Sequence, residues 1–500
     1  MNRFLVLFAS FASLIAPLPA RAQTPPPRPP NVVLILADDL GWTDTGFGGS
    51  RFYETPNLDA LAAAGIRLTS FYVSQSGPPS RASFLTGNYS ARTGVYAVDT
   101  LAPGDATARR MNPPANRPSL RPGSPTLASV LKAAGYSTGF FGQWQLGTEP
   151  EAHPGRFGFD ETMLTSDQYV GFQVSPAAEI PPGAHVTDFI TDRAIDFVSR
   201  QKDRPFFLLL SFLAVRAPFD VKPALIARFE KKAPAGGHRD AAYAAMVASL
   251  DENVGRVLAR LQEHQLGTNT VVVFTSDNGG VGGYPETDAG GRRIGSTDNS
   301  PLRGGQGMFY EGGIRVPFVV RWPGVVAPGT KCAQPGAHVD LLPTFCDIAA
   351  VRPPSSPPLD GISLMPVLRD PTASLGRDAI YWHFPGYLEA FGRPGWRTTP
   401  IGVIRAGNFK LLEFFEDGRL ELYNLVEDLG EKNNLVRSLP EKARELQLKL
   451  AAWRKAIDAP MPEPKPGPGA VIPPAPVAAP APAPAAAAPT PAPAPPKPRP

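Results

Sequence analysis

The chain has 500 residues, of which 60 are proline, and it carries a formal net charge of +4 at pH 7. Much of the excess proline and all of the net charge lie in the two ends, so the core between them is formally neutral. A neutral core excludes a protein that binds nucleic acid or a membrane surface through a strongly basic face.

The first 22 residues have the pattern of a signal peptide. Arg3 precedes a short apolar run, and a small-x-small cleavage pattern ends at Ala22. The run is too short to cross a bilayer comfortably, and no cysteine lies near the cleavage point to carry a lipid. We therefore expect cleavage near Ala22 and export to the periplasm or the extracellular space, without membrane insertion.

Two proline-rich segments flank the core. Residues 23–30 form an extended leader, and residues 459–500 alternate proline with alanine, a composition that cannot build a core and favours polyproline II. We expect residues 459–500 to be a disordered tail. Export permits a disulfide between Cys332 and Cys346, while two buried free thiols are an equal alternative.

The core predicts an α/β fold with a large, mostly parallel sheet between layers of helices. Residues 32–37, 206–214 and 271–276 are mainly apolar runs without alternation, as expected for strands that are buried on both faces. Apolar residues recur at helical spacing over residues 243–261, which indicates a crossover helix before the last of these strands. We assign residues 31–380 to this α/β domain.

The pattern changes to short strands after residue 380. Expected strands cover residues 400–405, 408–416 and 419–424, and an expected helix covers about 439–457. Residues 381–458 therefore predict a small C-terminal α+β subdomain, an antiparallel sheet with a terminal helix.

Acidic residues follow two of the buried strands directly. Asp38 and Asp39 end the first strand, and Asp277 and Asn278 end the strand at 271–276. Ligands of open α/β sheets sit beyond the carboxyl ends of the strands, so these four side chains are expected to converge there. Oxygen ligands without His or Cys suit calcium or magnesium. Capping of the following helices is the alternative for these aspartates.

Longer motifs then resemble the formylglycine-dependent, arylsulfatase-like sulfatases of the alkaline phosphatase superfamily. The resemblance covers nearly the whole core and rests on NVVLILADDLGWTD (31–44), TPNLDALAAAGIRLTSFY (55–72), PSRASFLTG (79–87), FTSDNGG (274–280), PLRGG (301–305), YEGGIRVPFVVRWPG (310–324), DLLPTFCDIA (340–349), LDGISLMPVL (359–368) and ELYNLVEDLGEKNNL (421–435). It implies sulfuric ester hydrolase chemistry, with calcium held at Asp38, Asp39, Asp277 and Asn278.

The resemblance also implies a formylglycine, made from the Cys or Ser of a C/S-x-P-x-R motif. Counting back from Arg81, the nucleophile position falls on Gly77, or on Pro78 if the preceding stretch is one residue short, and neither residue can become formylglycine. Ser76 is the nearest hydroxyl, and it is a candidate substitute only if a base or metal activates it. Arg81 itself is retained and is expected to bind substrate.

Four further positions depart from the pattern of the family. Gln143 and Gln306 stand where lysines are usual, and Gln145 and Arg216 stand where histidines are usual. Glutamine cannot supply charge or donate a proton to a leaving oxygen. Arg216 is expected either to attract an anionic substrate or to form a salt bridge with a site carboxylate and take the place of the metal.

These positions predict an exported pseudoenzyme that keeps the fold and the calcium site, has no formylglycine, and binds sulfated carbohydrate or a small anionic ester. The alternative is an active sulfate- or phosphate-ester hydrolase that uses Ser76 or metal-bound hydroxide. A third hypothesis makes the Pro/Ala tail the functional part of a cell-surface protein. His383 lies beside the expected C-terminal subdomain and predicts a hydrogen-bonded histidine of a surface cleft.

Overall fold

The computed structural model describes residues 28–283, 295–390 and 394–465. Within them, the largest sheet has nine strands in the order β12-β2-β11-β9-β1-β8-β5-β6-β7. Their bounds are β1 Asn31–Ala37, β2 Ile66–Leu68, β5 Ser137–Gly142, β6 Glu161–Thr165, β7 Val174–Ser175, β8 Phe206–Ser211, β9 Thr270–Ser276, β11 Phe318–Arg321 and β12 Thr330–Cys332. The central strands are parallel, whereas β11 runs antiparallel to β9 and β2, and β7 antiparallel to β6. The predicted mixed, mostly parallel sheet is confirmed.

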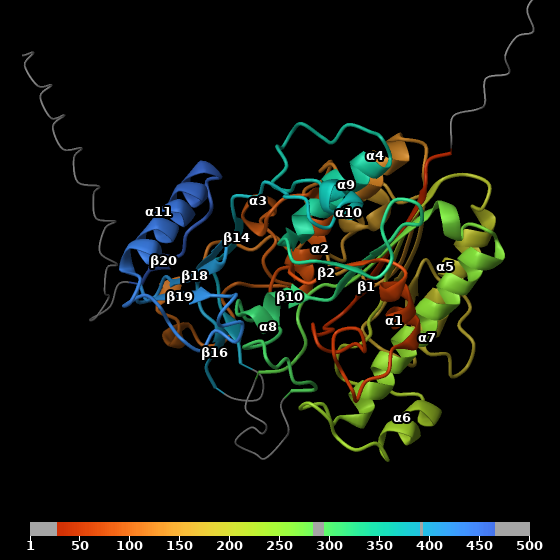
Figure 1. Ribbon diagram of the computed structural model, residues 1–500, viewed down its shortest axis with the longest axis horizontal. Coiled ribbons are helices and arrows are strands. Elements are labelled where there is room, and N and C mark those ends of the chain that lie inside the picture. Colours follow the sequence, from red (N-terminus) through yellow and green to blue (C-terminus); the bar gives the residue numbers. More distant parts are fainter. Residues whose placement is uncertain (1–27, 284–294, 391–393, 466–500) are drawn as a thin grey trace, which may run out of the picture.

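Helices cover both faces of this sheet (Figure 1). One layer contains α1 Pro56–Ala63, α5 Val186–Arg200, α6 Pro223–Phe229 and α7 Ala241–Glu263, and the other contains α2 Gly77–Thr86, α4 Leu127–Ala133, α9 Leu341–Ile348 and α10 Met365–Arg369. Val33 and Ile35 of β1 pack in the core under the first layer, while Leu34 and Leu36 pack under the second. Because both faces are covered, every residue of β1 is buried, which explains its uninterrupted apolar sequence.

Of two elements predicted from the sequence, the crossover helix is correct and the strand at 206–214 is too long. The crossover helix is present as α7, with its buried residues at the predicted helical spacing. The strand predicted over 206–214 is wrong at its end, because β8 stops at Ser211. Residues 212–214 leave the strand, and the carbonyl oxygen of Ala214 accepts a hydrogen bond from the N–H of Asp38 at 2.9 Å.

A second, four-stranded antiparallel sheet forms the C-terminal part, in the order β14-β17-β18-β19. Its strands are β14 Ile380–Phe384, β17 Ile401–Ala406, β18 Phe409–Phe414 and β19 Leu420–Asn424, and helix α11 Pro440–Ala456 packs against it at the edge of the molecule (Figure 1). The expected strands and helix are therefore present. A short hairpin, β15 Leu388–Glu389 with β16 Trp396–Thr398, projects from the same part.

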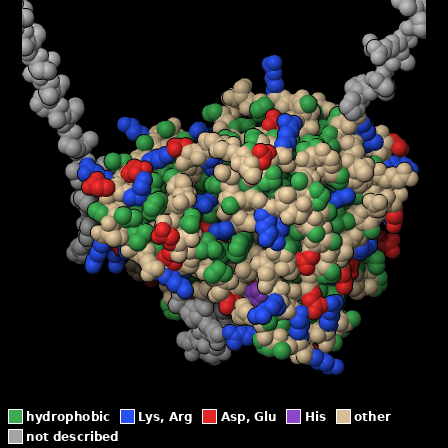
Figure 2. Space-filling model, in the orientation of Figure 1, with side chains coloured by type: hydrophobic (Ala, Val, Ile, Leu, Met, Phe, Trp, Pro, Cys, Tyr) green, Lys and Arg blue, Asp and Glu red, His purple; other side chains and the backbone are tan. Residues whose placement is uncertain are grey.

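Smaller elements complete the fold. The strands β3 Phe71–Tyr72, β10 Arg315–Val316 and β13 Gly336–Ala337 form a three-stranded sheet, and β4 Met111–Asn112 pairs with β20 Glu463–Pro464. The remaining α-helices of the described residues are α3 Ser90–Thr93 and α8 Glu311–Ile314. On the face shown in Figure 2, Lys and Arg side chains lie interspersed with Asp and Glu.

The predicted start of the C-terminal tail is wrong by several residues. The tail was expected from residue 459, but residues 459–465 are ordered and include β20, so they belong to the folded part. Residues 1–27, which include the expected signal peptide, and residues 466–500 lie outside the described residues. No helix of the described residues is long and apolar enough to cross a membrane. Cys332 and Cys346 are buried free thiols and form no disulfide.

Candidate active site

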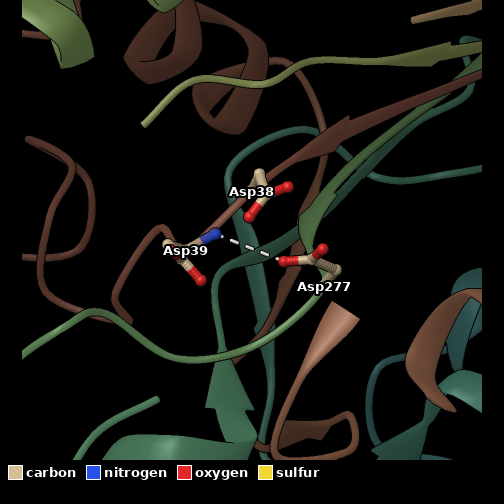
Figure 3. Close-up of side chains that lie close together, drawn as sticks. All are labelled: Asp38, Asp39 and Asp277. Atoms are coloured by element: carbon tan, nitrogen blue, oxygen red, sulfur yellow. Dashed lines mark hydrogen bonds between the residues drawn. The ribbon is translucent and has the colours of Figure 1, made fainter. Parts of the chain in front are cut away.

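The carboxyl ends of β1 and β9 bring the predicted acidic residues together. The strands are parallel neighbours with Ala37 opposite Ser276, so Asp38 and Asp277 follow at the same edge of the sheet. Carboxylate oxygens of Asp38, Asp39 and Asp277 all lie within 4.8 Å of one another, and Figure 3 shows the three side chains at the strand ends. We call these three residues the acidic cluster.

Asp39 has an unusual backbone conformation that fits it into this cluster. Its φ of 62° lies in the left-handed region, which non-glycine residues seldom adopt. Its N–H donates to Oδ1 of Asp277 at 3.2 Å, the dashed line in Figure 3, and its Oδ1 accepts from Nδ2 of Asn278 at 2.7 Å. A strained backbone held by several contacts is common at functional sites.

Burial makes it unfavourable for all three carboxyl groups of the acidic cluster to be ionised. The loss of hydration, together with the neighbouring carboxylates, raises the pKa of Asp38 and of Asp39 to about 7, and burial also raises the pKa of Asp277. Three such groups stay ionised together only when positive charge compensates them. Closely spaced, buried oxygen donors without His or Cys fit a hard divalent cation such as calcium.

Arg81 of α2 supplies one positive charge from within the protein. Its Nη2 lies 2.8 Å from Oδ2 of Asp277 and 3.4 Å from Oδ2 of Asp38. Its Nη1 donates to the carbonyl oxygen of Gln143 at 2.9 Å and to the hydroxyl of Ser211. Arg81 is 4% exposed, so it is a buried part of the site and it bridges two of the three carboxylates.

Gly77, the first residue of α2, faces the acidic cluster. A Cβ built on Gly77 would lie 2.8 Å from Oδ2 of Asp277 and would overlap Oε1 of Gln145. A side chain at position 77 would therefore point at the cluster, which is the direction that the nucleophile implied by the resemblance needs. The space for such a side chain is taken by Gln145.

Gln145 is held in that space by two partners. Its Nε2 donates to Oδ2 of Asp38 at 2.6 Å, and its Oε1 accepts from Nε of Arg81 at 3.2 Å. Its φ of 56° is again left-handed. The amide thus uses both its donor and its acceptor on residues of the site, and it closes the position opposite Gly77.

Comparisons with known proteins identify the family. A family model described as Sulfatase matches residues 30–351, and a model described as the C-terminal region of N-sulphoglucosamine sulphohydrolase matches residues 305–456. The chain is 32% identical to a sulfatase of Formosa agariphila over 90% of this chain and 93% of that one. The protein belongs to the sulfatase family.

Sulfatases are similar to this chain in sequence and in fold. N-acetylgalactosamine-6-sulfatase of Mus musculus is 33% identical over 68% of this chain and 66% of its own length. The crystal structure of Ps i-CgsB in complex with k-i-k-neocarrahexaose superposes with a TM-score of 0.71 and 27% identity, over 85% of this chain and 93% of that one. The chain therefore has the alkaline phosphatase-like fold of these sulfatases.

The two other glutamines form hydrogen bonds with residues outside the acidic cluster. Nε2 of Gln143 donates to the hydroxyl of Thr165, the last residue of β6, at 2.9 Å and to the carbonyl oxygen of Ser166 at 2.9 Å. Oε1 of Gln306 accepts from Nη1 of Arg397 at 2.5 Å. Neither side chain replaces the positive charge of a lysine.

Arg216 lies at the edge of the site. Its Nη1 is 3.6 Å from Oδ2 of Asp167. Among the described residues, Arg216 forms no ion pair with the acidic cluster, and it is Arg81 that bridges those carboxylates. The charge of Arg216 still reaches the site, because it lowers the pKa of Asp38 against the larger effect of burial.

Two other predicted positions take no visible part in the site. The hydroxyl of Ser76 is buried and has no hydrogen-bond partner among the described residues. His383 lies in β14, is 4% exposed, and has Nε2 2.8 Å from the carbonyl oxygen of Pro460. It is a buried histidine of the C-terminal sheet, not the surface-cleft histidine that was predicted.

Sequence reasoning missed Ser211 and Arg397. Ser211 ends β8 beside β1, so the rule that ligands gather at strand ends could have found it. Arg397 lies in a hairpin with no local motif, and only the fold places it next to Gln306.

Proposed function

We propose that this sulfatase-family protein is exported, binds calcium at Asp38, Asp39, Asp277 and Asn278, and binds sulfated carbohydrate or aryl sulfate-like anions with little or no turnover. The observation that carries the proposal is the pair Gly77 and Gln145. Gly77 has no side chain to attack sulfur, and Gln145 fills the space in which such a side chain would lie.

The remaining residues support binding better than hydrolysis. Arg81 neutralises part of the acidic cluster, and a bound divalent cation would supply the rest of the positive charge and attract an oxyanion. Gln143, Gln145 and Gln306 can donate hydrogen bonds, but an amide does not transfer a proton at neutral pH. No residue of this set has the chemistry of a general acid for the leaving oxygen.

The names of the relatives support the ligand class. One similar crystal structure contains a neocarrahexaose, and a mouse relative is called N-acetylgalactosamine-6-sulfatase. Both names describe sugars or their sulfate esters, so a sulfated carbohydrate is the ligand that we propose for this chain.

Hydrolysis through Ser76 is the competing function. A serine hydroxyl needs a nearby base or metal to become a nucleophile, and the hydroxyl of Ser76 has no hydrogen-bond partner among the described residues. We therefore expect no sulfate release from 4-nitrophenyl sulfate by the purified wild type in calcium. Release that Asp277→Ala abolishes would contradict the proposal, and loss of that release in Ser76→Ala would then identify the serine.

A repair experiment tests the role of Gln145 directly. We compare Gly77→Cys with Gly77→Cys/Gln145→His, each co-expressed with a formylglycine-generating enzyme. The single variant is expected to stay inactive, because Gln145 overlaps the new Cβ. Any measurable turnover is expected only in the double variant. Equal turnover of the two variants would show that Gln145 does not close the site.

Calcium binding has an independent readout in thermal stability. A ligand that binds only the native state raises its melting temperature, by an amount that grows with its concentration. We expect calcium to raise the melting temperature of the wild type and of Asp347→Asn, an exposed control on α9, but not of Asp277→Asn. The absence of any shift in the wild type would contradict the metal site.

A further inference from the structure

The N–H groups of Arg81 all have partners, and one of these partners is the partly exposed side chain of Gln145. Nη1 donates to the carbonyl oxygen of Gln143 at 2.9 Å and to the hydroxyl of Ser211, and Nη2 donates to two carboxylates of the acidic cluster. Nε donates to Oε1 of Gln145 at 3.2 Å. A ligand oxygen can therefore reach this guanidinium only by replacing a partner. Gln145 is the one partner that is neither backbone, nor fully buried, nor part of the acidic cluster.

The other end of the same carboxamide covers the acidic cluster. Nε2 of Gln145 donates to Oδ2 of Asp38 at 2.6 Å, and this oxygen also lies 3.4 Å from Nη2 of Arg81. The amide oxygen thus contacts a cation, and the amide nitrogen contacts an anion. An oxyanion at Arg81 and a divalent cation at Asp38 would make the same kinds of contact with full charges, which are stronger than those of a neutral amide. The carboxamide is therefore a neutral substitute for that pair of ligands.

The backbone around Gln145 is anchored, whereas its side chain is accessible. Trp144, the preceding residue, is 4% exposed and donates through Nε1 to the carbonyl oxygen of Ala152 at 2.7 Å. Leu146, the following residue, is fully buried. Gln145 lies between these two anchors and is only partly buried. Rotation about its side-chain bonds can therefore uncover both of its partners while the backbone stays in place.

We propose that the carboxamide of Gln145 is an internal competitor of the ligands, which leaves Arg81 and Asp38 when calcium and an anion bind. This inference rests on the proposed function, because it concerns the regulation of the same site. Calcium and the anion require the same movement, so whichever binds first removes the carboxamide for the second. The two ligands therefore bind cooperatively, and each raises the affinity for the other by the same factor.

The size of the effect follows from the population of the open side chain. A protein that is open in a fraction of its molecules has its dissociation constant raised by the inverse of that fraction. If Gln145 is closed in about 90% of molecules, each ligand alone binds about tenfold more weakly than it would to an open site. The second ligand to bind does not meet this obstacle, so the same factor of about ten adds to the coupling that opposite charges produce by themselves.

The test measures dissociation constants of calcium and of 4-nitrophenyl sulfate by calorimetry, each alone and each with the other at saturation. Gln145→Ala removes the competitor, so it is expected to bind each probe alone roughly tenfold more tightly than the wild type. The coupling between the two probes is expected to fall by the same factor, because only the attraction of opposite charges remains. Gln262→Ala, at an exposed glutamine of α7, is the matched control and should behave like the wild type.

A second variant protects the test against misfolding. Gln145→Gly also removes the side chain, and glycine readily adopts the φ of 56° found at this position, so it carries the test if Gln145→Ala does not fold. Affinities equal to or weaker than those of a wild type that binds both probes, or an unchanged coupling, overturn this inference and leave the proposed function intact. A wild type that binds neither probe overturns the proposed function, and it overturns this inference as well if the variants also bind neither.

Discussion

Two buried groups of charged side chains in this molecule balance their charge in different ways. The acidic cluster has three carboxylates and one bridging guanidinium, that of Arg81. The second group has two carboxylates and two cations, and we call it the Lys410 cluster: Lys410, Glu311, Glu431 and Arg315. The first has an excess of negative charge, and the second is neutral.

The Lys410 cluster links β18 of the C-terminal sheet to α8 and β10, and its charges are equal in number. Nζ of Lys410, in β18, lies 3.0 Å from Oε1 of Glu311 and 2.9 Å from Oε1 of Glu431, and all three residues are fully buried. Burial alone would raise the pKa of Glu311, but Lys410 and Arg315 outweigh it and lower that pKa to about 2. Burial and the neighbouring Glu311 raise the pKa of Glu431 to about 7 in spite of Lys410.

The difference in charge balance indicates a structural role for the Lys410 cluster and a binding role for the acidic cluster. A neutral buried network needs nothing from solution, and breaking it leaves an uncompensated charge. A buried network with excess negative charge needs a cation that the chain does not supply. Calcium should therefore change the energetics of the acidic cluster and leave the Lys410 cluster unchanged.

Removal of Lys410 should cause the largest loss of stability. Lys410→Met leaves Glu311 and Glu431 buried beside each other, and such a change typically costs about 3–5 kcal/mol. Urea unfolding should show this loss equally in calcium and in chelator, while the exposed control Lys432→Met should resemble the wild type. Recovery of stability by calcium would mean that the two clusters do not differ as proposed.

Removal of Arg81 should be costly only without calcium. Arg81→Met leaves Asp38 and Asp277 without their bridging cation, at a cost of about 3–5 kcal/mol in chelator. A bound divalent cation can compensate the same carboxylates, so most of that loss should disappear in saturating calcium. The measurement is urea unfolding of the variant in both conditions. An equal loss in the two conditions would argue against a metal at this site.

Acid should destabilise the C-terminal sheet through His383. Burial lowers the pKa of His383 to about 4, below the ordinary value of about 6.5 in the unfolded chain. The unfolded state then binds more protons between pH 6.5 and 4, so stability falls as the pH falls through this window, by about 3 kcal/mol in total. His383→Gln should flatten this part of the pH profile of unfolding. A profile like that of the wild type would show that His383 is not the group responsible.

The sequence predicted the central sheet well because local patterns determine it. The runs at 32–37 and 271–276 have no alternation, since each strand is covered on both faces, and the acidic residues after them meet because the strands are parallel. The end of the run at 206–214 was misplaced, because apolar residues continue into the turn that contacts Asp38.

Contacts between distant segments could not be predicted in this way. Gln145 reaches Asp38 across 107 positions, and Lys410 reaches Glu311 across 99. The substitution of Gln145 was visible in the sequence, but its position in the space opposite Gly77 depends on the folded backbone. The contact of Arg397 with Gln306 likewise depends on where the fold places the β15–β16 hairpin.

Removal of Arg216 should have the smallest effect on stability. Its ion pair with Asp167 spans 3.6 Å, with the two side chains 35% and 62% exposed, and exposed pairs of this kind contribute about 0–1 kcal/mol. Arg216→Gln should therefore unfold in urea within about 0.5 kcal/mol of the wild type. Its charge nevertheless acts on Asp38 and Asp39.

The loss of that charge should appear in ligand binding instead. An effect of about 1 kcal/mol on an anion near the cluster corresponds to roughly fivefold weaker binding of 4-nitrophenyl sulfate. The measurement is the dissociation constant of 4-nitrophenyl sulfate for Arg216→Gln in calcium, with Arg437→Gln, at an exposed arginine, as the control. A large loss of stability with unchanged binding would place Arg216 with the Lys410 cluster, as a structural charge, and not with the acidic cluster, where the charges act on the ligand.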